Sequence, residues 1–213
     1  MKKMWLWCLL LVCMPMVQAH AASSLVEGIE YEHIFPEQPT KAAPGKVEVV
    51  EIFWYACPHC YRLEPKLKEW LKNKPDNVDF YRIPAQFNKN WEIHAAAFYV
   101  ADSLGMVNEL HDAFFHEIHE KKNPLNTVDL LASFFLRHGV SRQKFLSVYN
   151  SFAVRTRMAH AKGMVQRYGV RSVPTFIING KYRTNVSMAG TEEELFRVIN
   201  ELVLRETNKS KSP

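Results

Sequence analysis

The sequence has 213 residues, of which 47% are hydrophobic, 12% aromatic and 23% charged. This balance excludes disordered, collagen-like and coiled-coil proteins, and the length suits one domain or one domain with a large insertion. The formal net charge is +5, from 27 lysines and arginines against 22 aspartates and glutamates. We expect no nucleic-acid binding, because the basic residues form no run or stripe of the kind that contacts phosphates.

The first 21 residues have the pattern of a secretory signal peptide. Lys2 and Lys3 precede an apolar stretch over residues 4–17, and the small residues Ala19 and Ala21 then form a typical cleavage site. We therefore predict cleavage near Ala21 and an exported chain of 192 residues with a formal charge of +3.

Two other interpretations of this segment remain open. One is an uncleaved membrane anchor, although the apolar stretch is shorter than the roughly 20 residues of a transmembrane helix. The other is a lipid anchor on Cys13, although Val12 stands where a lipid-attachment motif has a small residue. Cleavage near Ala21 leaves Cys57 and Cys60 as the only cysteines of the exported chain.

The first half of that chain alternates predicted strands with one helix. Residues Tyr31–Phe35 predict a short strand, and Lys46–Tyr55, rich in β-branched and aromatic residues, predicts a buried strand in the middle of a sheet. Apolar residues at helical spacing predict a helix over Pro58–Asn73, with a kink at Pro65. Residues Val78–Ile83 alternate in polarity and predict another strand.

The second half begins with helices only. Residues 88–168 contain amphipathic segments separated by glycine and proline, without a strand pattern. A strand over Val173–Ile178 follows, and an Asn179-Gly180 turn predicts a hairpin with a return strand over Lys181–Thr184. This order predicts an α/β fold in which an all-helical insertion interrupts one sheet.

The pattern of the C-terminal segment predicts a capped helix followed by a tail. Thr191 and Glu194 match a capping box, which predicts that the last helix runs from Thr191 to about Arg205. Residues 208–213 form a short segment of mostly polar and charged residues, and we predict that this segment is a disordered tail.

The two remaining cysteines form the sequence Cys57-Pro58-His59-Cys60, at the start of the first predicted helix. A disulfide between them closes a very short loop and stabilises a fold little, so we assign the pair a chemical role. One helical turn brings the two residues within disulfide geometry. The helix N-terminus favours a thiolate at Cys57. We therefore predict that Cys57 is the attacked or attacking sulfur and that Cys60 resolves the mixed disulfide.

His59 lies between the cysteines. We expect its imidazole to donate a hydrogen bond to the Cys57 thiolate or to place positive charge beside it. Either interaction favours the reduced form and makes the disulfide a stronger oxidant. The alternative is a solvated histidine without a role.

A metal site is the competing interpretation of Cys57 and Cys60. Structural zinc has four ligands, and no second CxxC or histidine pair stands at a suitable spacing. His111, His116 and His119 lie at helical spacing, and the last two could share a metal ion. We assign this stretch instead to the solvent-facing side of an amphipathic helix, and we predict no metal and no other cofactor.

The chain resembles the DsbA family of the thioredoxin superfamily. The segments EIFWYACPHCY and GVRSVPTFIINGKY, and the helical segment between them, carry this resemblance over nearly the whole exported chain. It implies a thioredoxin-like α/β fold with an all-helical insertion domain. The thioredoxin-like domain is then discontinuous and comprises residues 22–87 and 169–207, while residues 88–168 form the insertion domain.

The resemblance also implies site residues. Pro174 corresponds to a cis-proline that faces the redox pair, and the backbone of Val173 before it binds the substrate chain. Glu51 corresponds to a buried acid beneath the active site that assists proton transfer to or from Cys60. Pro58 belongs to the redox motif itself.

The activity implied by the resemblance is that of a periplasmic thiol:disulfide oxidase. It donates a redox-active Cys57–Cys60 disulfide to unfolded, newly exported proteins with free cysteines. A membrane oxidase that resembles DsbB and is coupled to quinone then reoxidises the pair, and the protein acts as a monomer. The main alternative is a disulfide isomerase or reductase on the same fold. A metal carrier or a non-catalytic binding module is a further one.

Overall fold

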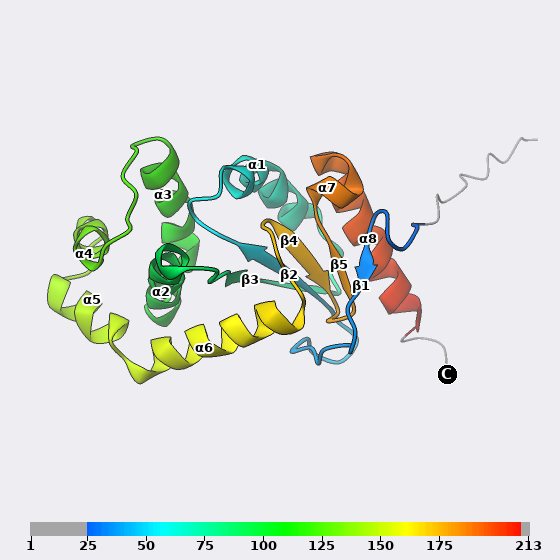
Figure 1. Ribbon diagram of the computed structural model, residues 1–213, viewed down its shortest axis with the longest axis horizontal. Helices are drawn as coiled ribbons and strands as arrows, with labels where there is room; N and C mark the ends of the chain where they lie inside the picture. The colour runs from blue at the N-terminus through cyan, green and yellow to red at the C-terminus, as the bar shows by residue number, and fades with distance from the viewer. Residues whose placement is uncertain (1–24, 210–213) are drawn as a thin grey trace, which may run out of the picture.

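The computed structural model describes residues 25–209, which form a five-stranded sheet with helices on its faces and at one end (Figure 1). The strand order is β1-β5-β4-β2-β3, and the β2–β3 pair is parallel while the other pairs are antiparallel. All five strands overlap segments that the sequence predicts. Their bounds are β1 Glu32–His33, β2 Val47–Phe53, β3 Val78–Pro84, β4 Thr175–Ile178 and β5 Tyr182–Thr184.

Strand β2 is buried along its whole length. It pairs with β3 on one side and with β4 on the other, so Glu51 lies opposite Arg82 in one neighbour and Phe176 in the other. Val49 belongs to the core on one face of the sheet, and Ile52 belongs to the core on the opposite face. Burial on both faces explains why the strand is almost continuously apolar and why its glutamates need partners.

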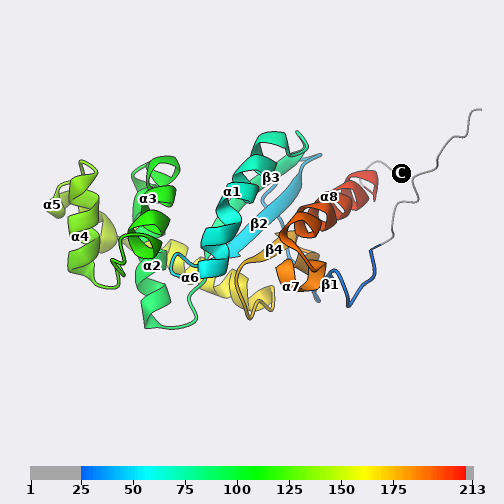
Figure 2. The same ribbon diagram turned by 90° about the horizontal axis from the view of Figure 1, so that it is seen from above.

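Helices cover both faces of the sheet (Figures 1 and 2). Helices α1 (Pro58–Asn73) and α8 (Glu192–Lys209) lie on one face, where Leu67 and Leu202 are fully buried in a shared core. Helix α6 (Phe152–Arg167) crosses the other face and leads the chain back to β4. The bounds of α1 are those predicted from the sequence.

The segment between β3 and β4 is helical, as predicted. Aromatic residues form much of its core. Five of them, Phe98, Phe114, Phe115, Phe134 and Phe135, are at most 6% exposed. The same core cluster continues into β2, so the division into two domains at residues 88 and 168 stays a prediction. Besides α6, the helices are α2 Lys89–Ser103, α3 Val107–His119, α4 Val128–Arg137 and α5 Arg142–Tyr149.

The β4–β5 hairpin turns at Asn179 and Gly180, as predicted. Both residues have positive φ angles, 51° and 65°, which a two-residue hairpin turn of this type requires. A Cβ atom at position 180 would lie 2.1 Å from the carbonyl oxygen of Gln38, so this position of the turn requires glycine.

The C-terminal helix is longer than predicted. Thr191 caps it, because its hydroxyl accepts a hydrogen bond of 3.1 Å from the Glu194 N–H. A four-residue helix, α7 (Val186–Ala189), precedes it. Helix α8 continues to Lys209, whose amine contacts the hydroxyl of Tyr182. The prediction of disorder was therefore wrong for residues 208 and 209, and residues 210–213 lie outside the described part of the chain.

Within residues 25–209, no helix has the length and apolar character needed to cross a membrane. The predicted signal peptide, residues 1–21, lies outside the described residues, as does the alternative anchor at Cys13.

Candidate active site

The redox motif lies where β2 ends and α1 begins. Cys57 is the N-cap residue of α1, and Pro58 is the first helical residue, where its missing N–H costs no hydrogen bond. The backbone N–H of Cys60 donates to the Sγ atom of Cys57 over 3.4 Å. Both cysteines are free thiols in this structure. The first turn of the helix therefore directs its amide groups at the Cys57 sulfur, as the sequence predicts.

The two thiols have opposite environments. A hydrogen bond from the Cys60 thiol, helped by the backbone N–H groups of Cys60 and His59 and by the charge of His59, lowers the pKa of Cys57 to about 6 against the effect of burial. Cys60 is completely buried, and burial raises the pKa of its thiol. At neutral pH this arrangement favours a thiolate at Cys57 and a thiol at Cys60.

The side chain of His59 is exposed and contacts a residue that the sequence analysis did not consider. Its Nδ1 atom accepts a hydrogen bond of 2.7 Å from the guanidinium of Arg62, one helical turn further on. The expected hydrogen bond from the imidazole to Cys57 is not among those formed within residues 25–209. His59 instead acts on the sulfur through its backbone N–H, and through its charge when the imidazole is protonated and no longer accepts from Arg62.

A cis peptide bond faces the redox pair. The bond between Val173 and Pro174 is cis, in agreement with the prediction. The Val173 carbonyl oxygen lies 3.5 Å from the Sγ atom of Cys57. A second cis bond, between Phe35 and Pro36, was not predicted. The backbone before Pro174 thus lies in direct contact with the reactive sulfur.

Glu51 lies in the middle of β2 and is completely buried. Its Oε2 atom accepts a hydrogen bond of 2.8 Å from the Nε atom of Arg82, whereas Oε1 has no partner among the described residues. Burial raises the pKa of Glu51 to about 8, although the charge of Arg82 opposes this effect. Glu51 is therefore buried, as predicted, and its raised pKa favours the protonated carboxyl group at neutral pH.

Arg82 also connects Glu51 to three residues that the sequence analysis missed as parts of the site. Its Nη2 atom lies 3.4 Å from a carboxylate oxygen of Glu64 on α1. The other oxygen of Glu64 lies 3.1 Å from Nε2 of His111 on α3, and Nδ1 of His111 lies 3.1 Å from the hydroxyl of Tyr55. These five residues form one buried network, which joins β2, β3, α1 and α3 beneath the redox motif.

The comparisons with known proteins agree on one family. A family model described as a DSBA-like thioredoxin domain matches residues 76–196. The thiol:disulfide interchange protein DsbA of Pseudomonas aeruginosa is 39% identical over 193 residues, which cover 91% of each chain. The DsbA of Pseudomonas syringae pv. tomato is 37% identical over 196 residues, 92% of this chain and 91% of its own.

Solved structures agree with these sequences. The crystal structure of P. aeruginosa DsbA superposes with a TM-score of 0.84 at 39% identity, over 90% of this chain and 99% of that one. The DsbA of Xylella fastidiosa superposes with a TM-score of 0.81 at 34% identity, over 86% and 98%. This chain belongs to the DsbA family. It is a thiol:disulfide oxidoreductase with a DsbA-like thioredoxin fold.

One prediction about the α3 histidines of this DsbA-family protein was wrong. His111 was expected on the solvent-facing side of the helix but is only 4% exposed, because Tyr55 and Glu64 supply hydrogen-bond partners for both of its ring nitrogens. His116 is exposed, as expected, and His119 bonds to the Tyr55 carbonyl oxygen. Within residues 25–209, no three histidine, cysteine, aspartate or glutamate side chains are grouped so that they could hold a metal ion.

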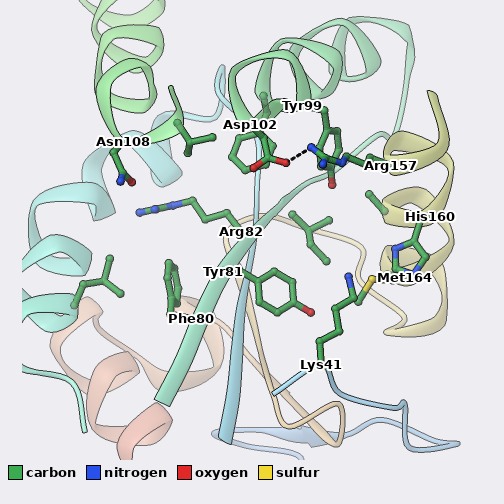
Figure 3. Close-up of a pocket in the computed structure, with 15 residues that line it drawn as sticks. Lys41, Phe80, Tyr81, Arg82, Tyr99, Asp102, Asn108, Arg157, His160 and Met164 are labelled. Carbon is green, nitrogen blue, oxygen red and sulfur yellow. Dashed lines mark hydrogen bonds and ion pairs between the residues drawn. The ribbon is translucent and has the colours of Figure 1, made fainter. Parts of the chain in front are cut away.

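A cavity of about 590 Å³ lies between β3, α2 and α6 of this DsbA-family fold (Figure 3). Phe80 and Arg82 of β3, Asn108 of α3 and Arg157 of α6 form part of its wall. Figure 3 shows the guanidinium of Arg82 directed toward Asn108. Arg82 lines this cavity and is 15% exposed, whereas the carboxyl group of Glu51 to which it bonds is fully enclosed.

Proposed function

We propose that this protein is a thiol:disulfide oxidase that donates its Cys57–Cys60 disulfide to newly exported, unfolded proteins with free cysteines. The observation that carries this proposal is the position of the Cys57 sulfur at the N-cap of α1, where amide groups and a second thiol stabilise its thiolate. A stabilised thiolate favours the reduced protein, which makes the disulfide form a stronger oxidant.

The proposed reaction consists of two thiol–disulfide exchanges. A substrate thiolate attacks the Cys57 sulfur, a mixed disulfide forms, and the Cys60 sulfur leaves as a thiolate. A second substrate thiolate then attacks the substrate sulfur of that mixed disulfide, and Cys57 leaves as a thiolate. The substrate loses two electrons and two protons. The electrons reduce the Cys57–Cys60 disulfide, and one proton goes to Cys60 while the other goes to solvent.

We assign the remaining site residues to steps of this reaction. Glu51 supplies the proton that Cys60 takes up, which its burial and raised pKa support. The backbone of Val173, held by the cis bond to Pro174, pairs with the extended substrate chain, and its short distance to the Cys57 sulfur supports this role.

Family membership and the predicted signal peptide support a proposal about the partners and the location. We propose that the protein acts in the periplasm as a monomer. Its reoxidation requires a second disulfide donor, and we assign this role to a DsbB-like membrane oxidase that passes the two electrons to quinone.

The redox equilibrium of the Cys57–Cys60 pair against glutathione tests the direction of the exchange. We expect a potential near the DsbA value of about −120 mV rather than the thioredoxin value of about −270 mV. The difference of about 150 mV corresponds to about 7 kcal/mol for two electrons. A value at the reducing end would contradict the oxidase and favour a reductase or isomerase on the same fold.

His59→Ser is expected to raise the pKa of Cys57 from about 6 toward its usual value and to weaken the protein as an oxidant. The rise should be partial, because serine keeps the backbone N–H that faces the sulfur. Thiolate absorbance in the ultraviolet measures this pKa as pH is varied. Arg62→Gln is a second variant for the same titration, because it keeps His59 but removes the hydrogen bond that holds the His59 imidazole. An unchanged Cys57 titration in His59→Ser would refute the role of His59.

A further inference from the structure

The buried network beneath the redox motif contains more acids than permanent cations. Glu51 and Glu64 both contact the guanidinium of Arg82, and all three are largely enclosed, with 0%, 5% and 15% of their side chains exposed. A buried charge without a partner is costly. Arg82 balances one carboxylate, so the other must either hold a proton or find a second partner.

The contacts of His111 fit an ionised Glu64. With Glu64 as a carboxylate, which only accepts hydrogen bonds, the Nε2 atom that faces it at 3.1 Å carries the hydrogen. The Nδ1 atom is then free to accept from the hydroxyl of Tyr55 at 3.1 Å. The imidazole is thus satisfied as a neutral group, and burial lowers its pKa. Glu64 therefore receives donors from both His111 and Arg82, whereas Glu51 receives a donor from Arg82 alone.

We propose that His111 and Glu64 are positioning residues that keep the negative charge on Glu64 and thereby keep the shared proton on Glu51. The inference rests on the proposed function of Glu51 as the proton donor to Cys60. The unpartnered Oε1 atom of Glu51 is the oxygen left free to carry this proton. The directions of the two pKa shifts agree. Burial raises the pKa of Glu64, but the hydrogen bond from His111 and the nearby positive charges of Arg82 and Lys68 together outweigh it and lower that pKa, whereas burial raises the pKa of Glu51.

This arrangement affects one step of the exchange. When the substrate sulfur bonds to Cys57, the Cys60 sulfur leaves with a negative charge and takes the proton of the Glu51 carboxyl group. Glu51 then carries the charge and regains a proton from solvent. The cavity against β3 is lined by Arg82, the residue whose guanidinium bonds to Glu51. Reoxidation of the pair removes the proton from Cys60 again, so the protein itself ends each cycle in the protonation state in which it began.

Other charged groups around the network are few and nearly balanced. From α1, the Cys57 thiolate faces Glu51 and acts to raise its pKa. Asp112 of α3 and Lys68 of α1 face the His111–Glu64 end, where they pair with each other at 2.5 Å. Because this pair is neutral as a whole, the proton position depends mainly on His111, Glu64 and Arg82.

The titration of the Glu51 carboxyl carbon by NMR tests this inference in the reduced full-length protein, with carbon-13-labelled glutamate. The Glu51→Gln variant assigns the signal. We expect a midpoint above the ordinary glutamate range in the wild type, and a fall of about one pH unit or more in both His111→Leu and Glu64→Gln. The first variant removes the donor to Glu64, and the second removes the charge that competes for Arg82.

Two further variants separate positioning from general damage to the fold. His111→Gln keeps an N–H donor toward Glu64 and should restore a midpoint near that of the wild type. His116→Leu makes the same change as His111→Leu on the exposed side of α3 and should leave the midpoint unchanged. An ordinary midpoint in the wild type, or an unchanged midpoint in folded Glu64→Gln, would overturn the proposal. Because the titration uses no substrate, its result does not depend on whether the protein acts as an oxidase.

Discussion

Cys57→Ser is expected to slow disulfide transfer to a reduced two-cysteine peptide by at least about a thousandfold, because the variant loses the sulfur that forms the mixed disulfide. Serine still accepts the N-cap hydrogen bond from Cys60, so the helix start and the fold should be retained. The measurement is the rate at which the peptide loses its free thiols in the presence of the protein and glutathione disulfide.

Cys60→Ser is the matched control for this loss. The variant keeps the reactive Cys57 but has no resolving thiol, so incubation with a peptide disulfide should trap a mixed disulfide. Mass spectrometry detects it as the added mass of the attached peptide chain. Wild-type transfer by Cys57→Ser would place the exchange on another residue, and failure of Cys60→Ser to trap any peptide would contradict the assigned roles.

The reduced protein is expected to gain stability relative to the oxidised protein as pH rises. In the folded state the Cys57 pKa is about 6, below the usual value of about 8.5 for an unfolded chain. Folding therefore favours the thiolate. This contribution is fully present above about pH 8.5 and is lost as pH falls through about 6. The oxidised protein has no thiol to titrate and lacks the contribution.

Unfolding by urea of both forms, between about pH 5 and about pH 8.5, measures this difference. The pKa shift corresponds to about 3 kcal/mol at most, and solvent near the sulfur reduces it, so we expect a change of about 2 kcal/mol in the difference between the two free energies of unfolding. Most other titrating groups are common to both forms and cancel. A difference that does not vary with pH would show that the Cys57 thiolate is not stabilised by the fold.

The redox motif and its surroundings in the chain could be predicted from the sequence because the responsible interactions are local. The N-cap position of Cys57 follows from a strand, a proline and a helical pattern within a few residues. The Asn179-Gly180 turn is equally local. Glu51 and Pro174 were predicted only through the family resemblance, since nothing in their own neighbourhood indicates a buried acid or a cis bond.

The proton-bearing network was decided by tertiary structure alone. In the sequence, Arg82 is an ordinary charged residue of an alternating strand. The parallel pairing of β2 and β3 places it opposite Glu51. From the sequence, His111 is predicted to face solvent, because helical periodicity shows which positions are polar but not which hydrogen-bond partners they have in the fold. Its burial is favourable only because Glu64, 47 residues away, and Tyr55, 56 residues away, supply hydrogen bonds. The sequence by itself determined the reactive pair, whereas long-range pairing of buried charges decided which neighbouring group holds the proton.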